Sequence, residues 1–280
     1  MMQLRIIHTT GFEYDGKALA SYNQARMTPL TAPGQIVVHN RLVVSPTPWT
    51  ATYRDYFGNE VTSFEVLDPH DSMTITATST VHTERAPSPG PVLSWEEIAD
   101  PEVTDRWTEY LELPTLVAPP EDVARTAREI ADASATPGEA ARRVCDHVHQ
   151  QVAYIPGTTD VATPAAEAWA QRSGVCQDMA HLVIGALRSI GIPTRYVSGY
   201  LHPRADAEVG ETVAGESHAW VEWWDDGWQG FDPTNDLEPG DRWVVVATGR
   251  DYLDVRPLHG IFHGAGTSSV FVEVAVTRLA

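Results

Sequence analysis

Cysteine and lysine are scarce in this 280-residue sequence, which has two cysteines and a single lysine, Lys17. Two cysteines in a chain of this length do not make a disulfide framework. We therefore expect free thiols and a cytoplasmic location, where thiols stay reduced. No apolar run approaches the roughly 18 residues that span a bilayer, and Met1–Thr10 lacks the pattern of a signal peptide. The sequence accordingly predicts no membrane association.

Positive charge is also scarce, since 38 acidic residues face 19 basic ones and the formal net charge is -19. Proteins that bind nucleic acid need a basic surface to contact phosphates, so this class of partner is excluded. The apolar fraction of 42% is enough to build a buried core. The length allows one large domain or two modest ones.

The N-terminal part of the chain, residues 1–85, has the composition of β structure. Segments rich in Val, Ile and Thr alternate with polar residues in a pattern typical of strands. The pair Gly58-Asn59 lies between aromatic and β-branched residues and predicts a hairpin turn. We expect a small β-sandwich domain here. The expected strands are Leu4–Thr10, Gln35–Ser45 and Ser72–Thr83.

The rest of the chain predicts a linker followed by an α+β domain. Residues 86–119 are rich in proline and contain one short helical stretch, Trp95–Tyr110. Residues 120–280 begin with apolar residues at helical spacing and continue with strand patterns. The expected helices start at Glu121 and cover Ala140–Val152, Ala165–Ala170 and Gln177–Ile190. The expected strands are Thr194–Tyr200, His218–Trp224, Trp228–Asp232 and Trp243–Ala247.

Cys176 lies where a loop gives way to a helix. Gly174 disfavours helix before it, whereas apolar residues follow it at helical spacing as far as Ile190. The free amides and the dipole of a helix N-terminus favour a thiolate, and the same amides can hold an oxyanion. Cys145, by contrast, falls on an apolar helical face, and we interpret it as a core residue.

His218 and Asp232 supply the other groups that thiol catalysis needs. An imidazole takes the proton of the thiol, and a carboxylate fixes the orientation and tautomer of the imidazole. Each residue alone has an ordinary interpretation, as a strand histidine or a turn aspartate before Pro233. Together with Cys176 they predict a Cys-His-Asp triad, and cysteine-dependent acyl transfer is the first hypothesis.

Zinc is the competing chemistry, with Cys176, His181 and His218 as its ligands. The sequence contains no CxxC, HExxH or similar spacing of ligands. We therefore expect no metal and no cofactor. His181 follows Cys176 by more than one helical turn, and we expect it to support the site or the domain junction.

The motifs that contain these residues resemble the transglutaminase-like superfamily, and in particular a bacterial branch with an N-terminal β domain. Members of that branch are often described as candidate cysteine proteases. The resembling segments in the second half of the chain are Gly174–His181, Leu187–Leu201, Ser217–Val221, Gly230–Asn235 and Gly249–Asp254. Those in the first half are Gln24–Pro29, Asp55–Val61 and Asp68–His70.

The resemblance implies a papain-like catalytic core with Cys176 as nucleophile, His218 as acid and base, and Asp232 as orienting residue. It implies that the Cys176 amide and a second donor hold the oxyanion, with Tyr154 as a candidate for that donor. Further candidates for oxyanion or substrate binding are Gln177, Asp178, Trp220 and Asn235. Residues Arg250, Asp251, Tyr252 and Asp254 either line the cleft or lock the C-terminal strands through salt bridges.

The predicted function is hydrolysis of an amide or peptide bond through a thioester on Cys176. Transfer of the acyl group to an amine is the alternative, because the triad is the same for both reactions. Transfer requires a cleft that excludes water, and Trp169, Trp220 and Trp223 are available as walls. A third hypothesis is a peptide-binding module without catalysis. We expect a peptide or protein substrate, and an oligomer through the strand Val270–Val276 is an alternative to pairing within the chain.

Overall fold

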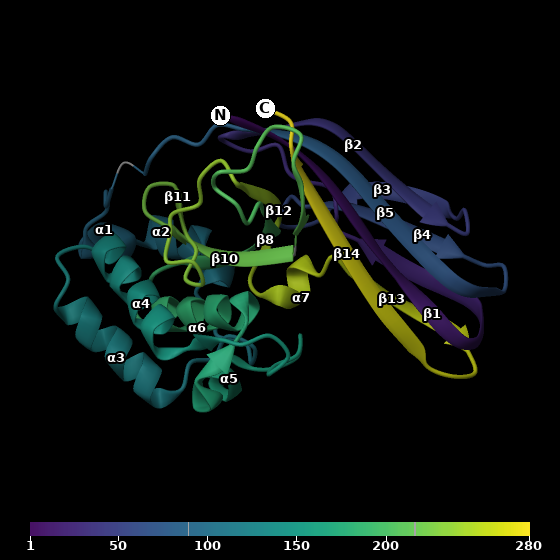
Figure 1. Cartoon of the computed structure of the whole chain (residues 1–280). Coiled ribbons are helices and arrows are strands. Elements are labelled where there is room, and N and C mark those ends of the chain that lie inside the picture. The colour runs from purple at the N-terminus through teal and green to yellow at the C-terminus, as the bar shows by residue number, and fades with distance from the viewer. Residues whose placement is uncertain (89, 216) are drawn as a thin grey trace.

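The structure is a computed structural model and describes residues 1–88, 90–215 and 217–280. Pro89, in the expected linker, and Glu216, just before Ser217, lie outside the described residues. A bent antiparallel sheet lies beside a body of helices that pack on a second antiparallel sheet (Figure 1). The α+β fold class predicted from the sequence is confirmed.

The first sheet contains the expected N-terminal strands together with strands from later in the chain. Its N-terminal strands are β1 (Met2–Ala25), β2 (Gln35–Ser45), β3 (Trp49–Arg54), β4 (Glu60–Val66) and β5 (His70–Thr83). Its later strands are β9 (Thr212–Gly215), β13 (Leu258–Gly264) and β14 (Ser268–Arg278). Strands β13 and β14 pair with β1, and β9 pairs with β14. The C-terminal strands, which we expected with the catalytic core, therefore belong to the N-terminal sheet.

This sheet folds over into two layers, and the long strand β1 runs through both of them. Its first half pairs with β5 and β14, and its second half pairs with β4 and β13. The register shifts between Glu13 and Ala18, where Gly16 has a φ of +99° that L side chains rarely adopt. The sheet folds over at this point, and Phe64, Met73 and other apolar side chains fill the space between the layers. This is the sandwich that the N-terminal sequence predicts.

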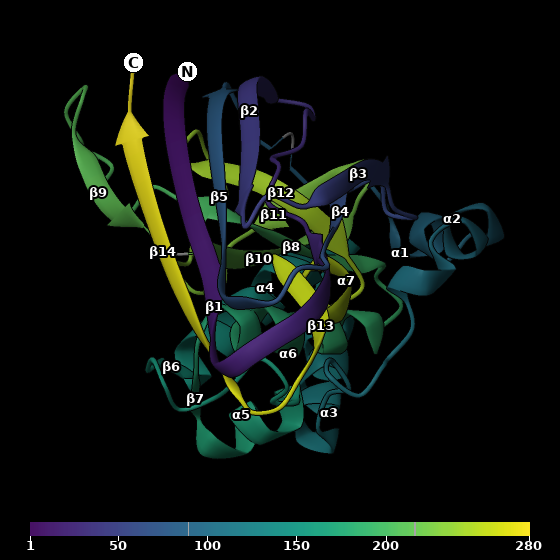
Figure 2. The ribbon, with the colours of Figure 1, turned by 90° about the vertical axis from the view of Figure 1, so that its right-hand side faces the viewer.

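The sheet shares one hydrophobic core with the helical body. Leu4 and Ile6 of β1 and Val276 of β14 belong to the same buried cluster as Val244 and Val246. Figure 2 shows β1, β5 and β14 side by side across the front of the body. No helix among the described residues is long and apolar enough to cross a membrane.

Two buried side-chain amides connect the first sheet to the helical body through hydrogen bonds. The second sheet has the strand order β11-β10-β8-β12, so β12 (Trp243–Gly249) is an edge strand. Gln35 accepts a hydrogen bond from the Val245 N–H and donates one to the Val245 carbonyl, both at 2.8 Å. Asn59 makes the same pair with Thr248, again at 2.8 Å. Together with the Leu30 N–H, which also donates to the Val245 carbonyl, these amides bind backbone groups of an edge that no further strand covers among the described residues.

The helical body, which the sequence predicts to be the catalytic part, is built around helix α6 (Cys176–Arg188), whose residues from Gln177 onward are all buried. Gly185 of this helix allows a close approach, because a Cβ there would lie 1.8 Å from the Val117 carbonyl oxygen. The other strands of the second sheet are β8 (Thr194–Leu201), β10 (Ser217–Trp224) and β11 (Trp228–Phe231). The other helices are α1 (Trp95–Ile98), α2 (Pro101–Arg106), η1 (Thr108–Tyr110), α3 (Glu121–Asp132), α4 (Pro137–Gln151), α5 (Ala165–Gln171) and α7 (Tyr252–Val255).

Candidate active site

Cys176 is the first residue of α6, as the sequence predicts, and it is half-buried. The loop before it is held by the two-residue strands β6 (Ala153–Tyr154) and β7 (Ser173–Gly174), which pair in parallel. The Asp178 carboxylate folds back and accepts hydrogen bonds from the Val175 N–H at 2.7 Å and the Thr159 hydroxyl at 2.6 Å. A Cβ on Gly174 would lie 2.7 Å from this carboxylate. Gly174 is therefore needed for the turn that presents the thiol.

His218 and Asp232 come together because they lie on neighbouring antiparallel strands. His218 is in β10, and Asp232 follows directly after β11, with Val221 paired to Phe231. The Nε2 atom of His218 lies 2.6 Å from Oδ2 of Asp232. The hairpin thus places the carboxylate behind the imidazole, in the position that an orienting residue requires.

Asp232 is fully buried, and several donors surround its carboxylate. Its Oδ2 accepts hydrogen bonds from the Trp243 indole at 3.0 Å and the Asn235 amide at 2.7 Å. Its Oδ1 accepts from the backbone N–H groups of Thr234 at 3.0 Å and Asn235 at 3.2 Å. Burial alone raises the pKa of Asp232, but the hydrogen bonds and charge of His218 and these donors outweigh it, so the pKa is lowered. The carboxylate therefore stays ionised behind the imidazole.

The His218 side chain connects the carboxylate to the thiol. Burial by itself lowers the pKa of His218, but hydrogen bonds and charge interactions with Asp232 and Cys176 raise it to about 10. Since Nε2 faces Asp232, the other ring nitrogen is the one available to Cys176. A protonated imidazole next to the thiol is the arrangement that stabilises a thiolate.

A cleft of about 370 Å³ opens over this pair and is lined by Cys176, Gln177, His218 and Tyr154. The Gln177 side chain donates to the Val161 carbonyl at 3.2 Å and so helps to shape one wall. A second hollow of about 410 Å³ continues from it past His218, Tyr154 and Asn235. The structure therefore brings the predicted Tyr154, Gln177 and Asn235 to the cleft.

Two of the predicted substrate-binding residues do not reach the cleft. Asp178 is turned inward to the Val175 amide and is 1% exposed. Trp220 is fully buried, and its ring stacks near that of His218 at a centroid distance of 6.2 Å. The expectation that they contact substrate is wrong, because one caps the helix and the other packs beneath the histidine.

Trp243 is a site residue that the sequence did not single out. Its indole N–H binds Asp232, yet it lies in β12, which is separated from β11 by two strands of the sheet. No local motif marks this contact. The strand order alone brings the indole to the carboxylate.

His181 supports the segment Gly249–Asp254 and not the thiol. Its Nε2 accepts a hydrogen bond from the Tyr252 N–H at 3.2 Å, and it is completely buried. Burial lowers the pKa of His181 to about 3. Tyr252 itself lines the cleft near Cys176. The expectation that His181 supports the site is consistent with this placement.

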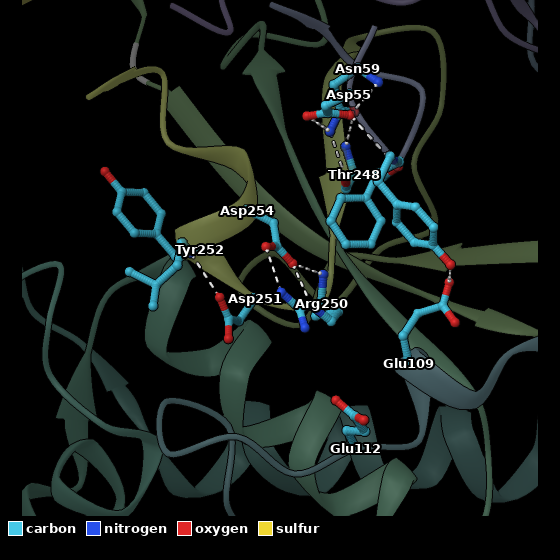
Figure 3. Close-up of polar contacts among 12 residues, drawn as sticks. Asp55, Asn59, Glu109, Glu112, Thr248, Arg250, Asp251, Tyr252 and Asp254 are labelled. Carbon is cyan, nitrogen blue, oxygen red and sulfur yellow. Dashed lines mark hydrogen bonds and ion pairs between the residues drawn. The ribbon is translucent and has the colours of Figure 1, made fainter. Parts of the chain in front are cut away.

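The segments Asp55–Val61 and Gly249–Asp254, noted separately in the sequence, lie side by side (Figure 3). Asn59 binds the backbone of Thr248, and Arg250 forms an ion pair with Asp254 at 2.9 Å. Tyr56 reaches across to donate to Glu109 at 3.0 Å. The Arg250–Asp254 pair lies within one segment, and the Arg250 guanidinium lies 5.7 Å from the centre of the Phe57 ring in the other. Tyr252 lines the cleft.

Among the described residues, no group of three or more His, Cys, Asp and Glu side chains is arranged to hold a metal ion. His181, one of the ligands of the competing zinc hypothesis, has its Nε2 engaged by Tyr252. Cys145 is buried, as expected for a core residue.

Comparison with known proteins gives matches along the whole chain. The family model described as Transglutaminase-like superfamily matches residues 124–233, and the Bacterial transglutaminase-like N-terminal region matches residues 4–82. An uncharacterized protein of Mycobacterium leprae is 43% identical over 100% of both chains. An uncharacterized protein of Mycobacterium tuberculosis is 34% identical, over 97% of this chain and 91% of the relative.

Two further matches are more distant or more local. A crystal structure from Cytophaga hutchinsonii, described as a candidate cysteine protease, superposes with a TM-score of 0.80 at 21% identity. It covers 100% of this chain and 91% of that chain, and it shows the shared fold. A protein-glutamine gamma-glutamyltransferase of Pseudomonas aeruginosa is 38% identical over 74 residues, which are 24% of this chain and 11% of that protein.

Proposed function

Because the chain belongs to the transglutaminase-like superfamily, we propose that it is an enzyme that forms a thioester between Cys176 and the acyl group of an amide or peptide. One observation supports this more than any other. The Nε2 atom of His218 lies 2.6 Å from the buried Asp232 carboxylate, and the His218 ring lines the same cleft as Cys176, whose thiol helps to raise the pKa of His218. Nucleophile, base and orienting group are therefore arranged as thiol catalysis requires.

The proposed reaction begins when the Cys176 proton passes to His218. The thiolate then attacks the carbonyl carbon, and the N–H of Cys176, at the start of α6, donates to the oxyanion. The tetrahedral intermediate collapses by breaking the C–N bond, and His218 gives its proton to the departing amine. A thioester remains on the sulfur until water or a second amine attacks it.

Hydrolysis is the activity that the cleft supports better. Amine transfer requires walls that keep water away from the thioester. Trp220 is fully buried, Trp169 and Trp223 are each 7% exposed, and none of these indoles lines the cleft. The side chains that do line it include Tyr154, which is 46% exposed. The open cleft favours water as the acyl acceptor.

Transfer remains the second candidate because of one specific similarity. The matched segment of the Pseudomonas aeruginosa protein belongs to a protein-glutamine gamma-glutamyltransferase. A binding module without catalysis is the third candidate, and the geometry around Asp232 weighs against it. Such a module has no need for a buried carboxylate held by Trp243, Asn235 and His218.

The first test is the rate at which iodoacetamide alkylates the protein at pH 7, followed by intact mass. We expect fast labelling at one site, its loss in Cys176→Ala, and labelling slowed at least tenfold in His218→Ala. Cys145→Ala is the matched control, because this thiol is fully buried and its removal leaves the fast phase intact. Labelling of Cys176 no faster than a free thiol, with no effect of His218→Ala, favours the binding module.

The acyl acceptor is tested with casein and a fluorescent primary amine together. Hydrolysis releases acid-soluble peptides, or ammonia without attachment of the amine, whereas transfer releases one ammonia for each amine that it attaches to the protein. Both products should vanish in Cys176→Ala. Amine incorporation that exceeds hydrolysis overturns the preference for water.

A further inference from the structure

Strand β14 has an edge that is only partly covered. On one side it pairs with β1 from Ser268 to Arg278. On the other side β9 covers it only from Val274 to Thr277. No other strand among the described residues pairs with its first half on that side. The segment Ser268–Glu273 therefore presents a free edge.

The backbone groups of Val270 and Val272 point to this free edge. Arg278 exchanges hydrogen bonds with Gly210 and Glu211, on the side of β9. Thr267 accepts from Asp15, on the side of β1. Successive residues of a strand direct their N–H and C=O groups to alternate sides, and β14 pairs with β1 without a register shift. Even-numbered residues of β14 therefore face away from β1.

The free edge lies at the catalytic cleft. Val272 and Val274 line the same cleft as Cys176 and His218. Figure 1 shows β14 running alongside the helical body and past one end of β10. The free edge continues the line of β9, whose last residue, Gly215, also lines the cleft. A strand placed along this edge would run directly beside the catalytic pair.

Val270 and Val272 place apolar, uncovered side chains on this edge. Val274 and Val276 are buried against the helical body, but Val270 and Val272 of the same face are 63% and 55% exposed. Exposed valines with free backbone groups at two-residue spacing are the features by which a sheet edge accepts an extended peptide. A single amino acid or a small amide matches neither feature.

We propose that the substrate is an extended polypeptide segment, which adds as a strand to β14 at Val270 and Val272 and so reaches Cys176. This inference rests on the proposed thiol chemistry and names its substrate class. It gives the N-terminal sheet a direct part in binding, because β14 is held in place by β1. A second copy of this chain is the other occupant such an edge admits, and the test separates the two.

The test compares two reagents that alkylate the same thiol. Iodoacetamide has no peptide backbone, whereas an acetyl-tripeptide chloromethyl ketone can extend along the edge. The peptide reagents are used as a mixture with equimolar residues at each position. We expect the peptide reagents to label Cys176 in the wild type faster than chloroacetone, which has the same reacting group. In Val272→Pro the ratio of peptide labelling to iodoacetamide labelling should fall about tenfold, as expected for a lost peptide hydrogen bond.

Proline at this position removes an N–H that faces away from β1, so the ladder to β1 keeps its bonds. Val272→Ala is the matched control, since it trims the side chain but keeps the N–H, and its ratio should fall about threefold at most. An unchanged ratio in Val272→Pro overturns the proposal. Slow iodoacetamide labelling of the wild type contradicts the thiol chemistry itself, so the two failures are distinguishable.

A second measurement does not depend on a folded variant. Peptide reagents that carry one N-methyl group, moved along the backbone, are tested on the wild type. Strand addition predicts that labelling slows when alternate amides are methylated. If methylation slows labelling equally at every position, or at none, the proposal is overturned. If light scattering shows a dimer and Val272→Pro converts it to a monomer, the edge binds a second copy of the chain. This result also overturns the proposal.

Discussion

Replacement of Asp232 by Asn tests the central contact of the site. The side chain keeps its size, but its negative charge is lost. The Asn oxygen can accept from the N–H groups of Thr234 and Asn235 only if its NH2 group faces His218 and the Trp243 indole. The imidazole must then accept a hydrogen bond at Nε2 from this NH2 group and carry its own proton on Nδ1, toward Cys176. In that tautomer it cannot take the proton of the thiol.

The size of the effect follows from the perturbed pKa of His218. Its rise from 6.5 to about 10, at about 1.4 kcal/mol per unit, corresponds to about 5 kcal/mol in favour of the imidazolium. Asp232 and Cys176 share this interaction. If Asp232 supplies about half of it, about 2.5 kcal/mol, alkylation of Cys176 at pH 7 should slow about 60-fold.

The assay is iodoacetamide labelling from pH 5 to 10, together with urea unfolding. Because the pKa of His218 is raised in the folded state, its stabilisation is complete below pH 6.5 and lost as the pH rises toward 10. Asp232→Asn should flatten this alkaline loss of stability. Asp225→Asn is the control, since Asp225 is buried but binds the N–H groups of Val92 and Leu93. Labelling within threefold of wild type in Asp232→Asn would refute the reasoning.

Three further predictions concern the surroundings of the site. Burial holds the pKa of His181 at about 3, so the stability that the neutral imidazole contributes is lost as the pH falls below 6.5. In urea titrations the wild type should therefore lose more unfolding free energy between pH 7 and 4.5 than His181→Gln does, by about 2 kcal/mol. Asn59→Ala should lower the unfolding free energy by about 2–4 kcal/mol, since it leaves two buried backbone groups of β12 unpaired. Asn59→Asp should cost at least as much, because it sets a buried carboxylate against the Thr248 carbonyl and the Asp55 carboxylate. Gly174→Ala should displace Asp178 and slow labelling of Cys176 at least tenfold. Gly227→Ala is the control and should leave labelling unchanged, because the nearest atom to its added carbon, Nε2 of Gln229, is 3.9 Å away.

Two features of the candidate site follow from local sequence patterns, namely the position of Cys176 at a helix start and the pairing of His218 with Asp232. Cys176 takes its place from a glycine before it and apolar helical spacing after it. His218 and Asp232 meet through a hairpin between adjacent strands, whose register follows from a short turn. Patterns of this range are visible in sequence, since strand and helix periods extend over only a few residues.

The contacts that could not be predicted are those set by long-range pairing. Trp243 reaches Asp232 only because β12 lies in the same sheet, two strands from β11. Alternation along β10 places Trp220 on the same face as His218, but the sequence does not show that the core covers it. Strand β14 pairs with β1 across almost the full length of the chain. Nothing local in Val270–Val276 distinguishes that pairing from a dimer contact.

This long-range pairing has a consequence for the two domains. If the N-terminal residues formed a separate sandwich, the fragment 86–280 would fold without them. In the structure that fragment loses β1, the partner of β13 and β14, and it loses Gln35 and Asn59 from the edge of β12. It also uncovers Val244, Val246 and Val276, which pack with Leu4 and Ile6.

Each such valine contributes about 1.5–3 kcal/mol when buried, and typical domains are stable by only about 5–15 kcal/mol. The fragment should therefore lack a cooperative unfolding transition and should bind a dye for exposed apolar surface. Supplying residues 1–85 as a separate chain should restore both the transition and the labelling of Cys176. Cooperative unfolding of the fragment alone, with Cys176 labelled at the wild-type rate, would contradict this view. The catalytic cleft is then a property of the whole chain, because its walls come from both sheets.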